Sequence, residues 1–266
     1  MSLRVIVTRP QDEAAVWLER LRAAGHDGRS LPLIAIEPGG PAVQAALRRA
    51  RAELGTYRAA MFVSGSAARA FFGIEGAAAV GLGIDADGAA DPRCWATGPG
   101  TVQALRAVGV DPRRIDAPLE SASTFDSEAL WSRVGDGLRV GDRVLLVRGG
   151  DSDGRPTGRD WLARRIDAAG GRSEEVVAYR RTVPAFDAAD LALAQASAAD
   201  GSVWLFSSSE AVGHLRAWLP ETDWHAARAV ATHERIAQAA RDAGFGAVRA
   251  SSPRLEDLIA SIESFR

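Results

Sequence analysis

Short apolar runs alternate with helical segments along the whole length of the chain. The apolar runs lie at residues 4–8, 29–34, 60–64, 94–97, 143–148, 174–179, 202–207, 228–232 and 247–251. Regular alternation of strands and helices is typical of α/β proteins with mainly parallel sheets. The runs are almost continuously apolar, which indicates strands whose two faces are both covered by helices. We therefore predict an α/β fold.

The predicted elements recur in the same order in the two halves of the chain. The strand RVIVTR at residues 4–9 is matched by RVLLVR at 143–148, and each is followed by a helix that ends in Ala-Ala-Gly. Two further pairs follow in order, FVSGS at 62–66 with LFSSS at 205–209, and QAxRxxG at 103–109 with the same pattern at 238–244. Several matches in one order predict two copies of an α/β unit. Two similar lobes leave a cleft between them, where small ligands usually bind.

The composition excludes several classes of chemistry. The length of 266 residues favours two domains. All 32 basic residues are arginine, so a Schiff-base lysine, a pyridoxal-phosphate anchor and a phosphate-loop lysine are excluded. The net charge of −2 argues against a nucleic-acid partner. The single cysteine, Cys94, excludes an intramolecular disulfide and fits a reducing compartment.

No apolar stretch is long enough to span a bilayer, and the N-terminal apolar run is too short for a secretion signal. We therefore expect a cytoplasmic protein without a membrane partner.

Small hydroxyl residues and glycines cluster where four predicted strands give way to helices. They are Ser64, Gly65 and Ser66, then Thr97, Gly98 and Thr101, then Ser207, Ser208 and Ser209, and finally Thr232 and His233. Ligands bind beyond the carboxyl ends of parallel strands, and the amides of a helix N-terminus bind carboxylate or phosphate. Helix capping explains any one junction equally well, because Ser and Thr are preferred caps. Four matched junctions favour an anion-binding cleft.

Two arginines and one tyrosine are further candidates. Arg9 and Arg148 end equivalent strands, where each can grip a carboxylate in bidentate fashion or pair with an acidic residue of the neighbouring helix. The sequence leaves both alternatives open. Tyr179 ends an apolar strand, and its phenol, with a reference pKa of about 10, is a proton donor at neutral pH. The alternative is a core tyrosine whose hydroxyl reaches the surface.

Other motifs fail on inspection, and no metal or cofactor is expected. The four histidines are scattered and only one cysteine could join them, which argues against zinc. The pattern GxGxxA at residues 81–86 follows no convincing strand. The DxDG openings at 85–88 and 151–154 lack the glutamate that closes a calcium loop.

Taken together, the motifs resemble those of the uroporphyrinogen-III synthase family over nearly the whole chain. The resemblance rests on Thr8-Arg9-Pro10, Leu31-Pro32-Leu33-Ile34, Phe62-Val63-Ser64, Thr97-Gly98-Pro99-Gly100-Thr101, Tyr179-Arg180-Arg181 and Phe206-Ser207-Ser208-Ser209. It implies two flavodoxin-like lobes with parallel sheets, joined by a two-stranded hinge at residues 36–41 and 176–184. The first lobe would combine residues 1–36 with 175–266, and the second would span 37–174. The repeat alone would instead cut the chain near Val140.

The resemblance also implies a reaction. Hydroxymethylbilane, a linear tetrapyrrole with eight carboxylates, loses its terminal hydroxyl as water, and its last ring attacks through a substituted carbon. The resulting spiro intermediate opens and recloses, which gives uroporphyrinogen III with ring D inverted. This implies a cofactor-free lyase of haem biosynthesis. We expect a monomer, because closure between two lobes needs freedom of movement and the sequence shows no evident oligomer face. In this scheme Tyr179 protonates the departing hydroxyl or hydrogen-bonds a water that does so. Substrate carboxylates are bound at the four junctions and by the two arginines.

Two points remain open in this interpretation. Glu234 follows His233 at the fourth junction and would repel a carboxylate, unless it points away or Thr232 and backbone amides make the contact. The rival function is a non-enzymatic protein of two lobes that binds a small molecule or regulates a partner.

Overall fold

The computed structural model describes residues 2–73, 92–119, 122 and 124–266. The chain folds into two compact units: unit 1 combines residues 1–35 with 182–266, and unit 2 comprises residues 36–181. The patterns at residues 81–86 and 85–88 lie outside the described residues. In the described part of the chain, no helix has both the length and the apolar character needed to cross a membrane.

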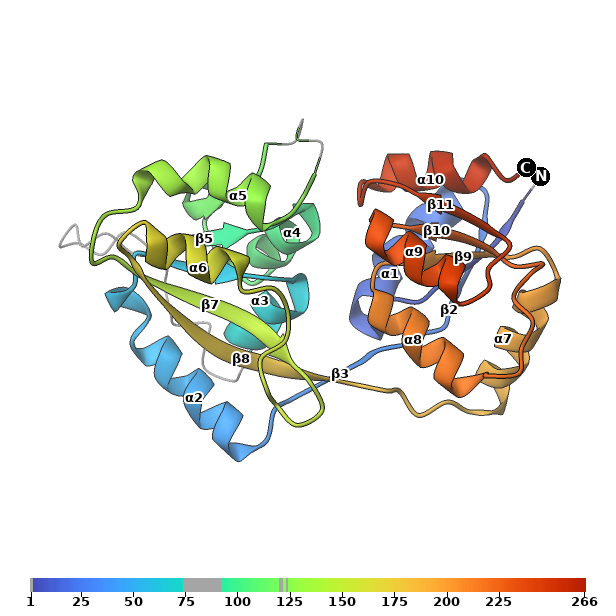
Figure 1. The fold of residues 1–266 in the computed structure, drawn as a ribbon, viewed down its shortest axis with the longest axis horizontal. Helices are drawn as coiled ribbons and strands as arrows, with labels where there is room; N and C mark the ends of the chain where they lie inside the picture. The colour runs from blue at the N-terminus through green and yellow to red at the C-terminus, as the bar shows by residue number, and fades with distance from the viewer. Residues whose placement is uncertain (1, 74–91, 120–121, 123) are drawn as a thin grey trace. The chain divides into compact units, whose positions relative to one another are not determined.

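Unit 1 is built around one parallel sheet of five strands, in the order β11-β10-β9-β1-β2. The strands are β1 (Arg4–Val7), β2 (Asp27–Ser30), β9 (Val203–Phe206), β10 (Arg228–Ala231) and β11 (Ala247–Ala250). The helices are α1 (Gln11–Ala23), α7 (Ala188–Ala199), α8 (Ser209–Trp218), α9 (Glu234–Asp242) and α10 (Leu255–Glu263). The first strand of the chain is thus paired with a strand about 200 residues later, as the blue and orange strands of one sheet show (Figure 1).

Both faces of this sheet are apolar, as the continuous runs predicted. Val5 and Val7 face Leu21 of α1 and Leu258 of α10 in one buried cluster. On β9, Trp204 is fully buried and packs edge-on against Trp224. The helix ends follow familiar rules, since α1 carries acidic residues in its first turn and arginines in its last turn, which complements the helix dipole.

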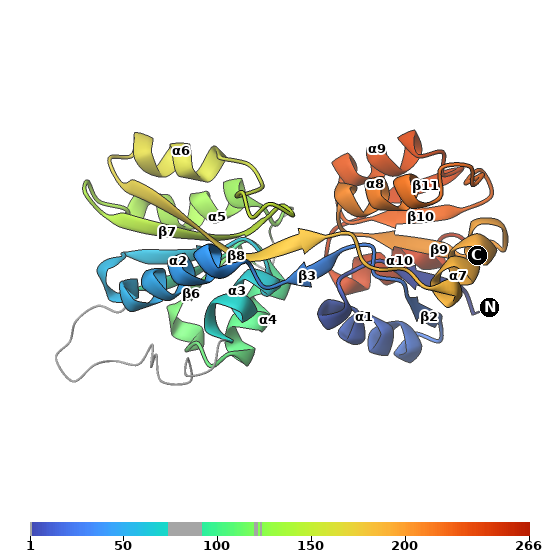
Figure 2. The same ribbon diagram turned by 90° about the horizontal axis from the view of Figure 1, so that it is seen from below.

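Unit 2 contains a sheet of six strands in the order β3-β8-β7-β4-β5-β6. The strands are β3 (Ala35–Glu37), β4 (Ala59–Phe62), β5 (Arg93–Ala96), β6 (Ile115–Asp116), β7 (Arg143–Gly150) and β8 (Arg172–Thr182). The helices are α2 (Pro41–Ala52), α3 (Gly65–Phe72), α4 (Pro99–Ala107), α5 (Ser127–Val134) and α6 (Trp161–Ala168). The pairs from β8 through to β6 are parallel, and β3 lies beside β8 at the edge (Figure 2).

Alternate residues of β4 enter two different cores, because side chains of a strand point to opposite faces. Ala60 and Phe62 belong to the cluster formed with α2, α3 and α4. Ala59 and Met61 belong to the cluster formed with α5 and α6. The sheet is therefore covered on both faces, and the two groups of helices are visible on either side of it in Figure 2.

The two sheets share one strand order. Read from β2, unit 1 runs β2-β1-β9-β10-β11, and unit 2 runs β8-β7-β4-β5-β6 beside the extra strand β3. With β1 equivalent to β7, both are the 2-1-3-4-5 order typical of flavodoxin-like folds. The predicted fold class, two similar parallel α/β units, is confirmed. The chain changes from one unit to the other inside β3 and again inside β8.

The structure differs from the predicted strands in two respects. The apolar runs predicted neither β3 nor β6, which have three and two residues, although β3 overlaps the hinge segment at residues 36–41 that the family resemblance implied. The second predicted strand, at residues 29–34, is placed too late in the chain. The strand β2 covers Asp27–Ser30, where polar residues pair with β1 through backbone hydrogen bonds, and the apolar Leu31 follows it.

Candidate functional site

The junction between β4 and α3 is built by residues 64–66. The Ser64 hydroxyl caps α3, accepting a hydrogen bond from the Ala67 amide at 3.1 Å. The Ser66 hydroxyl is buried and accepts from the Arg69 guanidinium at 3.2 Å. Gly65 lies so close to α4 that a methyl group in its place would come within 3.2 Å of the Ala104 side chain. The glycine therefore brings the beginnings of α3 and α4 together.

Tyr179 and Ser64 meet at this junction although they are 115 residues apart in sequence. The Tyr179 hydroxyl lies 3.1 Å from the Ser64 hydroxyl, and either oxygen can be the donor. Tyr179 is only 4% exposed, so nearly the whole residue is buried. The contact joins the candidate acid to a helix N-terminus, where the helix dipole favours negative charge.

The junction between β5 and α4 presents a helix start without a side-chain cap. Gly98 precedes the helix and supplies no side-chain cap, and Pro99 occupies its first turn. Thr101 is buried, and its amide donates to the Gly98 carbonyl at 3.1 Å. The Thr97 hydroxyl donates to the Val63 carbonyl at 3.5 Å, which ties this junction to the preceding one.

The two arginines predicted to bind carboxylates are engaged in ion pairs. Arg148 is buried, with one nitrogen 3.1 Å from the Glu175 carboxylate and another donating to the Arg159 carbonyl. Arg9 pairs with Glu13 at 2.9 Å, and its guanidinium lies 4.5 Å from the centre of the Trp17 ring. Glu13 belongs to the neighbouring helix, as in the alternative left open by the sequence, whereas Glu175 lies on the neighbouring strand β8. Asp160, at the start of α6, is a second and longer partner of Arg148 at 3.8 Å. Substrate contact by either arginine stays a prediction.

Burial lowers the pKa of Arg9, and the nearby Glu13 carboxylate opposes that shift. The pair therefore holds the guanidinium charge in a position that burial alone would disfavour.

In unit 1 the equivalent junctions are also helix caps. The Ser208 hydroxyl accepts from the Glu210 amide at 3.2 Å, between Ser207 and Ser209. The Thr232 amide donates to the Phe206 carbonyl at 3.0 Å, which extends the sheet by one rung. These contacts fix the ends of β9 and β10 and the starts of the helices that follow them.

His233 caps α9 through its ring. Its Nδ1 accepts from the Arg235 amide at 3.1 Å, so the proton of the neutral ring is on Nε2. A neutral His233 can thus donate to a carboxylate through Nε2 without first being protonated. Glu234 pairs with Arg241 at 2.7 Å along its own helix, which offsets the repulsion of an anion expected from the sequence.

The structure corrects the alignment of the internal repeat by one residue. The strand β4 ends at Phe62 and β9 ends at Phe206, and the serine two residues later caps the next helix in each case. Ser64 is therefore equivalent to Ser208, whereas the sequence match paired it with Ser207. Serines at three consecutive positions made the two alignments equally good in sequence.

Two residues of the family motifs have contacts that the sequence did not assign. Thr8 is buried, and its hydroxyl donates to the Leu205 carbonyl at 2.7 Å, which fastens the end of β1 to β9. Arg180 donates to the carbonyls of Ser152 and Pro38 and pairs with Glu37 at 3.1 Å. Arg180 thus ties β8 to the end of β3 and to the loop after β7. Its position beside Tyr179 was the only signal for it in the sequence.

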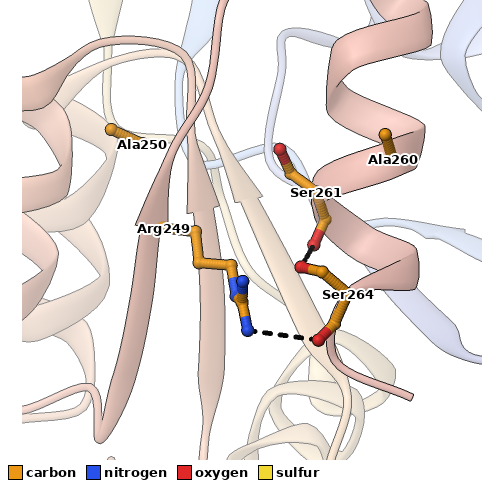
Figure 3. Close-up of a pocket in the computed structure, with 5 residues that line it drawn as sticks. All are labelled: Arg249, Ala250, Ala260, Ser261 and Ser264. Atoms are coloured by element: carbon orange, nitrogen blue, oxygen red, sulfur yellow. Dashed lines mark hydrogen bonds between the residues drawn. The ribbon is translucent and has the colours of Figure 1, made fainter.

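A surface hollow lies between β11 and α10 (Figure 3). Its lining consists of Arg249, Ala250, Ala260, Ser261 and Ser264. The Arg249 guanidinium already donates to the Ser264 carbonyl at 3.1 Å and lies over the Phe265 ring. None of the predicted site residues lines this hollow, and we assign it no part in the chemistry.

Comparison with known proteins identifies a family match over most of the chain. The family model described as uroporphyrinogen-III synthase HemD matches residues 15–260. A mutant uroporphyrinogen III synthase from the extremely thermophilic bacterium Thermus thermophilus has a similar structure, with a TM-score of 0.54 and 18% identity over 99% of this chain and 98% of that one. The uroporphyrinogen-III synthetase of Helicobacter pylori has a TM-score of 0.56 and 12% identity over 100% of both chains. At such low identity, these two structures establish the shared fold.

Proposed function

Because this chain belongs to the uroporphyrinogen-III synthase family, whose members cyclise hydroxymethylbilane in tetrapyrrole biosynthesis, we propose that it does so with Tyr179 as the acid. The family match over residues 15–260 is the observation that supports this reaction. The contact of 3.1 Å between the hydroxyls of Tyr179 and Ser64 supports the choice of acid. The product is uroporphyrinogen III, with ring D inverted and one water released.

Ser64 prepares Tyr179 to give up its proton. The Ser64 oxygen already accepts from the Ala67 amide, so its own hydrogen can be donated to the Tyr179 oxygen. With Ser64 as the donor, the phenol proton points away from Ser64 and passes to the terminal hydroxyl of the substrate. The carbon–oxygen bond then breaks, and water leaves. The negative charge that develops on Tyr179 is stabilised by the Ser64 hydrogen and by the N-terminus of α3.

The proton balance requires Tyr179 to recover its proton within one turnover. The overall reaction releases one water and no net proton. The substituted carbon of the last ring attacks the azafulvene, and the spiro intermediate fragments and recloses. The ring carbon that forms the final bond then loses a proton, and that proton restores the phenol. No nucleophilic side chain is needed in this sequence of steps, because the substrate supplies both the carbon nucleophile and the electrophile.

Carboxylate binding is assigned to the helix N-termini at the junctions. The net charge of −2 cannot steer a substrate with eight carboxylates over long distances, so local groups must hold it. In unit 2 these are the first turns of α3 and α4. In unit 1 they are the first turns of α8 and α9, with His233 donating through Nε2. Holding the two ends of the linear tetrapyrrole in one geometry favours the spiro route over direct closure to the type I isomer.

We further propose that the protein acts as a monomer in the cytoplasm and without a cofactor. The absence of lysine from the sequence supports a reaction without a cofactor, because it excludes the cofactors that are anchored on lysine.

The test is an assay of the product isomer. Freshly made hydroxymethylbilane is incubated with the protein, the product is oxidised, and the type I and type III uroporphyrins are separated by chromatography. A predominance of type III over a control without enzyme supports the proposal. Type I alone, with an active synthase in parallel, would favour the non-enzymatic binding protein instead.

A further inference from the structure

The hydrogen bond between Tyr179 and Ser64 spans an intervening strand. Tyr179 belongs to β8, Ser64 follows β4, and β7 lies between those two strands in the sheet. Neighbouring strands are about 4.8 Å apart, so β8 and β4 are separated by roughly 10 Å. The tyrosine ring must therefore cross β7 to bring its hydroxyl to Ser64.

Gly149 is the residue of β7 beneath the ring. It is paired with Tyr179 in the register of the two strands. A Cβ atom at Gly149 would lie 2.7 Å from the Tyr179 Cζ and 2.8 Å from its hydroxyl oxygen, closer than real Cβ atoms approach other atoms. Gly149 is not among the glycines with positive φ, so its backbone conformation alone does not demand glycine. Glycine is required there because the Tyr179 ring fills the space that a side chain would occupy.

A register shift in β8 places the tyrosine over this glycine. Arg148 pairs with Val177, but the next residue of β7 pairs with Tyr179, so Ala178 is the extra residue of a bulge. Without the bulge, Tyr179 would be one position further along and opposite Gly150. β-Bulges occur beside active sites, where they redirect a side chain. The shift thus aligns the ring with the residue that leaves room for it.

The backbone of Gly149 is held in place by residues of the loop that follows β7. Its carbonyl accepts two hydrogen bonds from Thr157, one from the amide and one from the hydroxyl, each at 3.1 Å. The following residue forms an isolated bridge with Pro156. A methyl group at Gly149 would therefore displace the tyrosine ring more readily than the strand.

We propose that Gly149 is a positioning residue for the cyclisation, because the absence of a side chain there lets Tyr179 lie across β7 and reach Ser64. This proposal rests on the role of Tyr179 given above. It assigns a function to a residue that touches neither the departing hydroxyl nor a carboxylate.

The first experiment compares Gly149→Ala with Gly55→Ala, whose added methyl meets nothing within 4 Å in the same unit. We expect kcat of Gly149→Ala to fall about 10- to 100-fold with KM unchanged, since a displacement near 1 Å costs that much. We expect Gly55→Ala to keep the wild-type kcat. The combined variant Gly149→Ala with Tyr179→Phe should be no slower than Tyr179→Phe alone. If the losses of kcat in the two single variants multiplied in the combined variant, the proposal would be overturned, because Gly149 would then act independently of the Tyr179 hydroxyl.

A second readout does not depend on activity. The chain has two tyrosines, Tyr57 and Tyr179, so 3-fluorotyrosine in the full chain gives two fluorine signals, assigned with Tyr57→Phe. Gly149→Ala should shift the Tyr179 signal and leave the Tyr57 signal in place. An unshifted signal would overturn the proposal whatever the activity. A shifted signal with full kcat would also overturn it, and would place the failure in the role assigned to Tyr179.

A stability cycle covers the case in which Gly149→Ala folds poorly. If the methyl clashes with the ring, its effect on the urea unfolding midpoint should vanish in a Tyr179→Ala background, where the ring is absent. An equal drop in both backgrounds would mean that the methyl clashes elsewhere, and the proposal would fail.

Discussion

Ser64 and Ser208 hold equivalent places in two sheets of the same strand order, yet their surroundings differ. Each serine caps the helix that follows its strand. Ser64 also meets Tyr179, whereas unit 1 contains no tyrosine at all. The strand that carries Tyr179 has eleven residues, and its counterpart β2 has four. The same scaffold thus gains a candidate acid in one unit through the length of a single strand.

The central strands β1 and β7 differ in the same way. After Arg9 the chain turns at Pro10 and begins α1, whereas after Arg148 the strand continues through Gly149 and Gly150. The extension of β7 provides both the pairing partner for the long β8 and the gap under the tyrosine ring. The internal repeat therefore accounts for the helix caps common to both units, and the lengthened strand pair accounts for the contact between Tyr179 and Ser64 that is confined to unit 2.

The largest effect that would test this contrast is expected from Tyr179→Phe. Loss of the hydroxyl should lower kcat on the order of 100-fold, the lower end of what a positioned acid supplies. The loss is partial because most of the catalysis comes from holding the substrate. Tyr57→Phe is the matched control, because it removes the same hydroxyl group at the opposite end of β4 from Ser64. Steady-state kinetics with analysis of the product isomers measures both, and an unchanged kcat in Tyr179→Phe would remove the contrast between the units.

The two arginines should differ in their effect on stability. Arg148→Met leaves the Glu175 carboxylate without its buried partner and should cost about 2 kcal/mol of unfolding free energy, since Glu175 is partly exposed. Arg9→Met removes an ion pair with the first turn of α1 and a stacked tryptophan and should cost about 1 kcal/mol. Urea denaturation measures both values. A raised KM with unchanged stability would instead make either arginine a substrate ligand.

The two capping serines should separate turnover from binding. Ser64→Ala should lower kcat about tenfold, because Tyr179 loses its hydrogen-bond donor, and should cost about 1 kcal/mol of stability for the lost cap. Ser208→Ala should cost a similar amount of stability and raise KM at nearly constant kcat. Equal losses of kcat in the two variants would show that the junctions are functionally equivalent.

The last effect is confined to alkaline pH and concerns unit 2. Burial and the nearby Glu174 carboxylate raise the pKa of Tyr57 to about 12. The unfolded chain ionises first, near pH 10, so stability is lost as the pH rises from 10 to 12. Burial likewise raises the pKa of the Cys94 thiol to about 12, which adds to the loss. Unit 1 has neither residue.

Tyr57→Phe should therefore reduce, but not abolish, the fall in the urea midpoint between pH 10 and 12. An identical slope in the wild type and the variant would contradict the raised pKa of Tyr57.

The sequence predicted those features that depend on local pattern. Apolar runs located most of the strands, and hydroxyl residues after them located the helix starts at Ser64 and Ser208. The ion pair of Arg9 was also among the alternatives, because Glu13 lies in the first turn of the helix that follows Arg9 in the sequence. The closer partner of Arg148 is on a neighbouring strand, and no spacing in the sequence indicates it.

The features that determine the geometry around Tyr179 are non-local. Tyr179 lies over Gly149 because a bulge at Ala178 shifts the register of β8. A glycine in a strand gives no sign in the sequence that an aromatic ring packs on it. The assignment of strands to units is also non-local, since the repeat reveals which strands are equivalent but not which of them pair. The short edge strands β3 and β6 carry too few residues for any periodic signal.

The interleaved path of the chain has a consequence for its synthesis. Residues 36–181 are continuous, so unit 2 can fold as soon as they have left the ribosome. The strand β1 lacks its neighbour β9 until residue 206 has been made, which at 5–20 residues per second is a delay of about 10 to 40 s. During that time an apolar strand with an open edge is exposed beside the growing chain. The N-terminal segment is therefore where we expect chaperones to bind the nascent chain, and where aggregation begins when translation stalls.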